Sequence, residues 1–193
     1  MSRIRLGIIG LGRGFMLTLP ALIGDARIAL AGAADQRADA CAQFAREFGG
    51  RAFNSPEEMF AAPDIDAVYI ASPHEHHAAQ TIAALDAGKH VLVEKPMALT
   101  AFEVDAVIHA HKKAGTFVGE AFMYRLHPQT QKLWELVNSG TIGEVRAIKS
   151  SFGFQMGKFI PDHRIFASEL AGGGILDVGG YPVSMSRFIA GAS

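Results

Sequence analysis

The sequence predicts a doubly wound α/β fold, in which helices cover both faces of a parallel β-sheet. Short apolar runs alternate with helical segments over residues 1–120, a rhythm typical of parallel strands joined by crossover helices. A glycine-rich loop, residues 10–14, directly follows the first apolar run, and Glu94-Lys95-Pro96 ends a later one. Ligands of open α/β sheets bind at the carboxyl ends of the strands, so these segments predict a ligand site at that edge.

The individual elements follow from local signals in the chain. Strands are expected where apolar runs end in polar or glycine-containing loops, at residues 4–9, 27–33, 66–71, 89–93 and 116–119. Helices are expected at residues 15–23, in an alanine-rich segment that stops at Gly49-Gly50, from Ser55 onward, at 75–87 and at 100–114. Pro20 should kink the first of these helices, while Ser55 and Thr100 supply N-caps to two later ones.

The alternation changes near Glu120, which we take as a domain boundary. The first domain is expected to span residues 1–120 and the second residues 121–193. In the second we expect a helix at 128–138, a long strand at 145–154 and a helix at 181–190. One strand and two helices cannot bury the apolar face of a sheet, so this part is expected to be an incomplete α+β domain.

Composition excludes several classes of protein. The chain has 193 residues, 49% of them hydrophobic and 19% charged, as expected of a folded chain. A formal net charge of −1 argues against nucleic-acid and anionic-membrane partners. No apolar stretch reaches the ~18–20 residues that span a bilayer, and the N-terminus has no signal-peptide pattern. Cys41 is the only cysteine, which suits a reducing compartment, so we expect a cytoplasmic protein.

The loop Gly10-Leu11-Gly12-Arg13-Gly14-Phe15 lies between the first strand and the first helix. Backbone N–H groups and the helix dipole can hold a pyrophosphate at such a position. In the usual spacing a third glycine would stand at position 15, where this chain has Phe15 and places Gly14 one residue early. Many strand–helix turns carry glycines, so the loop alone is weak evidence for nucleotide binding.

Asp35 ends the second predicted strand and adds to the case for a nucleotide. A carboxylate there would accept hydrogen bonds from the adenosine ribose and repel a 2′-phosphate. Taken alone, Asp35 fits a helix cap equally well, and Arg37 could instead hold that phosphate. Loop and aspartate together predict nucleotide binding, and both NAD and NADP stay open as cofactors.

Lys95 and Tyr181 are the candidate catalytic side chains. Taken alone, Lys95 is a charged strand end, and Tyr181 is an aromatic residue that packs at a helix start. Beside a nucleotide site, a lysine ammonium would lower the pKa of a tyrosine from its usual ~10. Such a pair can remove a hydroxyl proton while a hydride leaves the same carbon. Asp177 stands four residues before Tyr181, so a helix would place both on one face.

These residues resemble the glucose-fructose oxidoreductase / inositol dehydrogenase / MocA family. The resemblance extends over essentially the whole chain. It rests on residues 10–12, 71–73 with His77, 87–96, 120–125 and 172–181. Many relatives carry histidine where this chain has Tyr181, so the chain is most similar to the tyrosine-type branch with dihydrodiol and D-xylose dehydrogenases. Family members continue beyond the position of Ser193, so most of the sheet of the second domain is expected to be missing.

The resemblance implies a Rossmann domain that binds NAD or NADP, and an α+β domain that often forms a homo-oligomer interface. It implies an oxidoreductase that acts on a CH–OH group of a small sugar, polyol or related alcohol or diol. Tyr181 would be the acid/base, Lys95 its partner, and Asp177 a substrate-positioning or relay residue. The expected cofactor-binding residues are Gly10, Gly12, Arg13, Gly14, Phe15, Asp35, Arg37, Ser72, Pro73, His77, Glu94 and Lys95.

His74, His76 and His77 raise the question of a metal site. With one cysteine and no second ligand cluster, we expect no metal. Two alternatives to the dehydrogenase stay open. One is a nucleotide-binding protein without catalysis, and the other is an NAD-dependent glycosidase of the same family.

Overall fold

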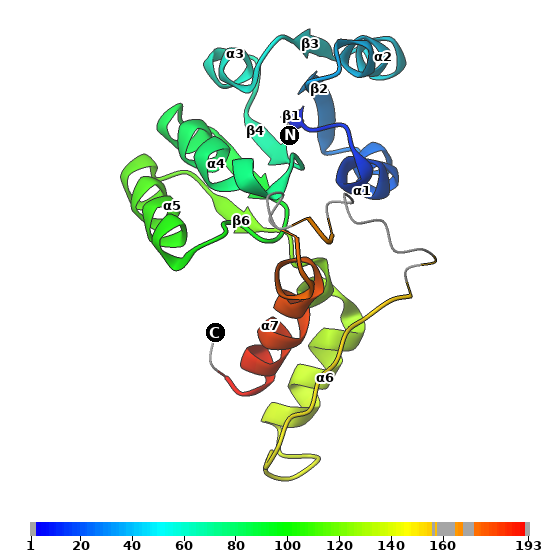
Figure 1. The fold of residues 1–193 in the computed structure, drawn as a ribbon, viewed down its shortest axis with the longest axis vertical. Helices are drawn as coiled ribbons and strands as arrows, with labels where there is room; N and C mark the ends of the chain where they lie inside the picture. The colour runs from blue at the N-terminus through cyan, green and yellow to red at the C-terminus, as the bar shows by residue number, and fades with distance from the viewer. Residues whose placement is uncertain (1–2, 156, 158–164, 168–171, 192–193) are drawn as a thin grey trace. The chain divides into compact units, whose positions relative to one another are not determined.

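The computed structural model describes residues 3–155, 157, 165–167 and 172–191. It comprises two compact units, Met1–Ala121 and Phe122–Ser193, and each is described by itself (Figure 1).

The first unit is built on a six-stranded sheet in the order β3-β2-β1-β4-β5-β6, with every neighbouring pair parallel. Its strands are β1 (Ile4–Ile9), β2 (Ile28–Ala34), β3 (Arg51–Phe53), β4 (Ala67–Ile70), β5 (His90–Val93) and β6 (Val118–Glu120). The chain order reverses between β1 and β4, and ligands of such sheets bind outside the strand ends at this switch point. The predicted parallel sheet is confirmed, and β3 is an addition that the sequence did not reveal.

Helices cover both faces of this sheet, as Figure 1 shows. They are α1 (Arg13–Gly24), α2 (Ala38–Phe48), α3 (Pro56–Ala61), α4 (His77–Asp86), preceded by the 3-10 turn η1 (His74–His76), and α5 (Ala101–Ala114). One apolar cluster joins Ile8 of β1 to residues of α1 and α2, and a second joins Ile9 to residues of α3, α4 and α5. Adjacent residues of β1 thus point to opposite faces, and the predicted doubly wound fold is confirmed.

Capping residues set several helix boundaries where the sequence predicted them. Ser55 Oγ accepts the Glu58 N–H at the start of α3, and Thr100 forms a reciprocal capping box with Glu103 at the start of α5. α1 begins at Arg13, before the predicted residue 15, and continues past Pro20 to Gly24.

The regular secondary structure among the described residues of the second unit is helical. It contains η2 (Met123–Leu126), α6 (Pro128–Asn138), a π-helical turn η4 (Ile175–Gly179) and α7 (Gly180–Ile189). The prediction of a strand at 145–154 is wrong, because this segment pairs with no strand among the described residues. Its side chains contact α7 instead: Ser150 Oγ donates to the Pro182 carbonyl at 3.2 Å, and the Phe152 ring lies 5.1 Å from that of Tyr181. Alternating apolar residues favour an extended chain, but a strand also needs a backbone partner.

Candidate functional site

The glycine loop after β1 approaches the end of β4 closely at one point. Gly10 has a φ of +87°, and a Cβ there would lie 2.6 Å from the Ala71 carbonyl oxygen, so only glycine fits. At Gly12, which begins α1, an added Cβ would meet no atom of the described residues within 4 Å. No side chain in the described chain caps this helix start, and Arg13 is exposed in its first turn. A helix N-terminus that no described side chain caps suits a phosphate anion.

Gly14, and not residue 15, occupies the position at which α1 packs closely against the sheet. Gly14 faces β4 and the end of β5, since a Cβ there would lie 3.4 Å from the Ala71 Cβ and 3.7 Å from the Glu94 Cγ. The Phe15 side chain is buried in the core and packs against the Phe44 ring at 6.1 Å. The shifted glycine therefore permits close helix–strand packing, while Phe15 presents only its backbone toward the loop.

Asp35 and Arg37 form a bonded pair at the end of β2. The Asp35 carboxylate accepts the Leu11 N–H at 2.7 Å, the Arg37 N–H at 2.9 Å and the Arg37 side-chain Nε at 3.0 Å. The Arg37 guanidinium also donates to the Leu11 carbonyl at 3.2 Å. Burial opposes the charged form of Asp35, but the donors from Arg37 and Leu11 outweigh it and hold its pKa below the usual range.

These bonds change the interpretation of Asp35 and Arg37. No side chain among the described residues caps α2, so helix capping does not account for Asp35. Its carboxylate instead fixes the glycine loop through Leu11, while the exposed Arg37 guanidinium is anchored beside it. The two residues that the sequence set against each other therefore act as one unit.

A part-buried hydrogen-bond chain that the sequence did not predict joins α1 to the end of β5. Tyr69 Oη donates to Glu94 Oε1 at 2.6 Å and lies 3.1 Å from Thr18 Oγ1, which itself donates to the Gly14 carbonyl at 3.0 Å. Burial, and then the bond to Glu94, raises the pKa of Tyr69 above its usual value. Tyr69 is the one hydroxyl-bearing residue in the otherwise apolar β4, which was the available signal.

Further hydrogen bonds connect the ends of β4, β5 and β6. His77 is fully buried, and its ring nitrogens lie 2.7 Å from the Pro96 carbonyl oxygen and 2.9 Å from that of Ser72. Ser72 Oγ donates to Gln80 at 2.6 Å, and Pro73 caps η1. Lys95 is partly buried in this edge of the sheet, and the Lys95–Pro96 peptide bond is cis.

The second unit holds the other two candidate catalytic residues. Asp177 is buried in the π-helical turn, and Tyr181 lies in the first turn of α7. The Tyr181 ring packs edge-on to Phe122 at 5.5 Å and to Phe152 at 5.1 Å, and lies 6.0 Å from that of Tyr124. A π-helical turn, which the sequence did not predict, therefore separates Asp177 from Tyr181 in place of the expected α-helical spacing.

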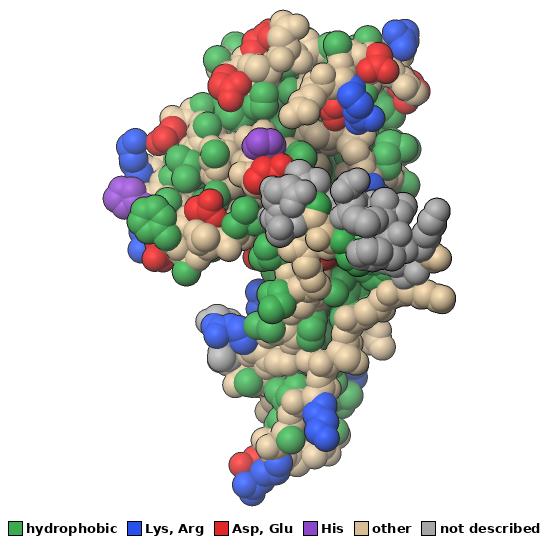
Figure 2. All heavy atoms as spheres, viewed as in Figure 1, with side chains coloured by type: hydrophobic (Ala, Val, Ile, Leu, Met, Phe, Trp, Pro, Cys, Tyr) green, Lys and Arg blue, Asp and Glu red, His purple; other side chains and the backbone are tan. Residues whose placement is uncertain are grey.

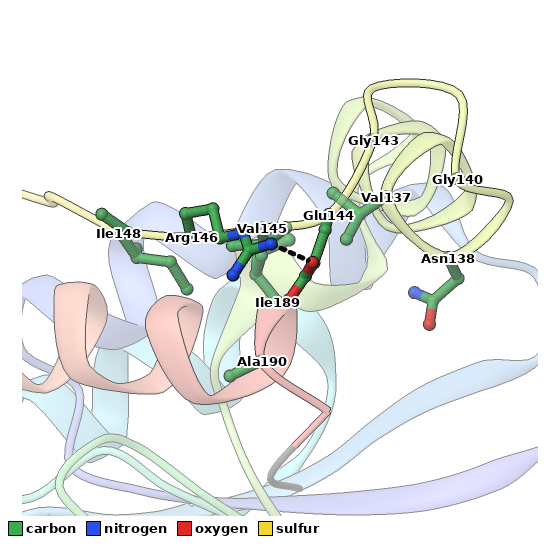
Figure 3. A pocket seen from close by; sticks show the side chains of 11 residues that line it. Val137, Asn138, Gly140, Gly143, Glu144, Val145, Arg146, Ile148, Ile189 and Ala190 are labelled. Atoms are coloured by element: carbon green, nitrogen blue, oxygen red, sulfur yellow. Dashed lines mark ion pairs between the residues drawn. The ribbon is translucent and has the colours of Figure 1, made fainter.

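An open hollow of about 810 Å³ also lies in the second unit (Figure 3). It is formed by the end of α6, the following loop and the end of α7, and it contains no residue of the predicted site. Its ion pair, Arg146 with Glu144 at 2.7 Å, is largely exposed and so contributes little. Figure 2 shows that hydrophobic side chains are also exposed on the drawn face of this unit.

Among the described residues, no group of three or more His, Cys, Asp or Glu side chains could hold a metal ion. None of the helices in that part of the chain combines the length and the apolar character of a membrane span.

The strand order, the glycine loop at the switch point and Asp35 after β2 define a dinucleotide-binding Rossmann domain. Residues 4–122 match the oxidoreductase family with an NAD-binding Rossmann fold, and residues 130–193 match the GFO/IDH/MocA C-terminal domain. The chain belongs to the Gfo/Idh/MocA oxidoreductase family, which confirms the expected resemblance.

Individual relatives are dehydrogenases and reductases by name. The chain is 41% identical over 187 residues to a D-xylose 1-dehydrogenase (NADP(+)) of Haloferax volcanii, covering 96% of this chain and 57% of that protein. It is 38% identical over 151 residues to a mouse trans-1,2-dihydrobenzene-1,2-diol dehydrogenase, covering 78% and 44%. The crystal structure of KijD10, a 3-ketoreductase from Actinomadura kijaniata in complex with NADP and TDP-benzene, superposes with a TM-score of 0.84 at 28% identity, covering 98% and 58%. The chain therefore spans only about half the length of each of these three proteins.

Proposed function

We propose that this protein is an NAD(P)-dependent oxidoreductase that transfers a hydride between nicotinamide and a sugar, polyol or related alcohol or diol. The observation that carries the proposal is the arrangement at the switch point. The N-terminus of α1, which no described side chain caps, lies beside a carboxylate–guanidinium pair, and Lys95 follows the strand next to β4. The named activities of the relatives above support the same class of reaction.

The first unit would hold the cofactor. The amide groups around Gly10 and Gly12 suit the pyrophosphate, and the exposed Arg13 adds positive charge there. Asp35 and Arg37 would contact the adenosine ribose or its 2′-phosphate, with Ser72, Pro73 and Glu94 along the nicotinamide half. A bound nicotinamide ring supplies the hydride acceptor. Both cofactors suit this geometry, because a carboxylate and a guanidinium lie side by side.

Proton transfer would fall to the protein. Tyr181 would remove the substrate hydroxyl proton, and Lys95 would favour the phenolate form of Tyr181 through its positive charge. Asp177 would position the substrate or relay the proton. The aromatic rings around Tyr181 restrict its orientation, which a positioned base requires.

Turnover of variants tests these roles. In the active protein, Lys95→Ala and Tyr181→Phe are each expected to lower kcat by about 10²–10⁴-fold and to leave NAD(P)H affinity within a few-fold. Tyr124→Phe and Lys112→Ala are the matched controls. Tyr124 lies in the same aromatic cluster and loses only its 2.7 Å bond to Ser184, and Lys112 is an exposed lysine on α5. Turnover of Lys95→Ala within a few-fold of wild type would refute the assignment.

A second candidate is cofactor binding without turnover by this 193-residue chain. The predicted cofactor residues all lie in the first unit, whereas Asp177 and Tyr181 lie in the second. The first unit could therefore bind the cofactor even where the catalytic residues of the second do not act. Fluorescence titration with NADH and NADPH, followed by assay of a panel of sugars and polyols, separates the two. Binding without turnover supports the second candidate. Release of an aglycone without net cofactor reduction would instead identify a glycosidase.

A further inference from the structure

His77 connects two strand ends at the candidate site. It is the first residue of α4 and has no exposed surface. Its Nδ1 lies 2.7 Å from the carbonyl oxygen of Pro96, beyond the end of β5, and its Nε2 lies 2.9 Å from that of Ser72, beyond the end of β4. A single imidazole therefore spans two neighbouring strands at the edge where Lys95 is located.

Both partners of the ring are hydrogen-bond acceptors. A backbone carbonyl oxygen only accepts hydrogen bonds, so a hydrogen bond to it requires an N–H on the histidine. A neutral imidazole has one N–H, and its other nitrogen would then direct a lone pair at a carbonyl oxygen at 2.7 or 2.9 Å. Which nitrogen donates depends on the tautomer, and in either tautomer both nitrogens lie within hydrogen-bond distance of a backbone carbonyl oxygen.

The contact with Pro96 acts directly on Lys95, which is its neighbour in the chain. The next residue is held as well, because the Met97 N–H donates to the Glu120 carboxylate at 2.8 Å. The backbone that follows Lys95 is thus fixed by α4 on one side and by the end of β6 on the other. With both ring nitrogens engaged by the backbone, His77 has no nitrogen left to bind a ligand.

We propose that His77 is a positioning residue whose two ring nitrogens hold the Lys95–Pro96 backbone against the end of β4, and that it does not itself bind the cofactor. The proposal rests on the role proposed above for Lys95. Loss of either contact would release the segment that carries Lys95, so turnover should fall when one of the two contacts is removed.

Two conservative variants divide the bridge into its halves. In His77→Asn the amide nitrogen lies near the former Nδ1 and can still donate to Pro96. In His77→Gln it lies near the former Nε2 and can still donate to Ser72. Neither side chain spans both carbonyls. We expect both to lower kcat by about tenfold or more, with Asn retaining more activity than Gln, and both to leave NAD(P)H affinity within about threefold.

A direct spectroscopic measurement completes the test. Nitrogen-15 spectra of histidine-labelled wild-type chain report the His77 ring itself and need no variant. Ring-nitrogen signals of His77 that stay unchanged when NAD(P)H binds support the proposal, and a change that shows contact between a ring nitrogen and the cofactor overturns it.

The failure of this inference is separable from failure of the proposed function. If Lys95→Ala abolishes turnover while both His77 variants keep kcat within about twofold, only the positioning role is refuted. If Lys95→Ala itself leaves turnover intact, the role of Lys95 fails, and the positioning role fails with it. Should either His77 variant fold poorly, the spectra of the wild type decide.

Discussion

Replacement of Gly10 by alanine is the sharpest test of the loop geometry. The added Cβ would lie 2.6 Å from the Ala71 carbonyl oxygen and 2.7 Å from the Ser72 nitrogen, and both are backbone atoms that cannot rotate away. The backbone φ of +87° costs an L-residue about 1–2 kcal/mol. Overpacking adds about 1–3 kcal/mol, so Gly10→Ala should destabilise the first unit by about 2–5 kcal/mol.

Gly12→Ala is the matched control two residues away. A Cβ there meets no described atom within 4 Å, and the backbone φ of −83° suits any residue. Its free energy of unfolding should stay within about 1 kcal/mol of wild type. Because the same Cβ would occupy the space before the helix N-terminus, Gly12→Ala should weaken NAD(P)H binding while the fold persists.

Urea unfolding followed by far-ultraviolet circular dichroism measures both variants. The single tryptophan, Trp134, lies on α6 and would report only the second unit. With a slope of about 2 kcal/mol per molar, the Gly10→Ala midpoint should fall by about 1–2.5 M. Equal midpoints for Gly10→Ala and Gly12→Ala would refute the close approach of the loop to β4.

Three further predictions concern charged groups of the first unit. Hydrogen bonds from Arg5 lower the pKa of Asp66 to about 2, so the stability that this pair adds is present above the unfolded value of 3.8 and disappears as pH falls through about 2. Asp66→Asn should therefore have a lower free energy of unfolding than wild type near neutral pH, and the two values should converge at the acid end of a pH series. Arg37→Ala should weaken NADPH binding about tenfold more than NADH binding, measured by fluorescence titration, while a uniform loss would contradict a 2′-phosphate contact. Lys89→Met should cost about 2–4 kcal/mol in urea unfolding, because the buried ammonium donates to two carbonyl oxygens at 2.7 and 2.8 Å, and a cost near zero would show that water replaces it.

Local signals allowed most of the first unit to be predicted from the sequence. Ser55 and Thr100 cap helices where expected, because capping depends on residues within one turn. β3 has only three residues, too few to display a period, and its pairing with β2 is a long-range contact. The strand predicted at 145–154 was wrong for the opposite reason. Its apolar residues alternate clearly, but no described strand pairs with it.

The candidate site was predicted less completely, because residue types alone do not reveal which groups bond to each other. From residue type alone, Asp35 and Arg37 indicate opposite cofactor preferences, whereas the structure pairs their side chains at 3.0 Å. Tyr69 belongs to no sequence motif. Its place in the hydrogen-bond chain depends on contacts with Thr18 and Glu94, which are distant in the sequence. Sequence patterns identified the edge of the sheet, and three-dimensional contacts were needed to reveal its internal hydrogen bonds.

The chain of contacts from Gly14 through Thr18 and Tyr69 to Glu94 has a consequence for preorganisation. It connects the first turn of α1 to the residue that precedes Lys95 through the buried Tyr69 and the half-buried Thr18 and Glu94. These bonds hold the start of α1 and the lysine segment at a set separation without any ligand. A dinucleotide that binds along this edge meets a rigid template, so less conformational entropy is lost than if each end had to be ordered separately.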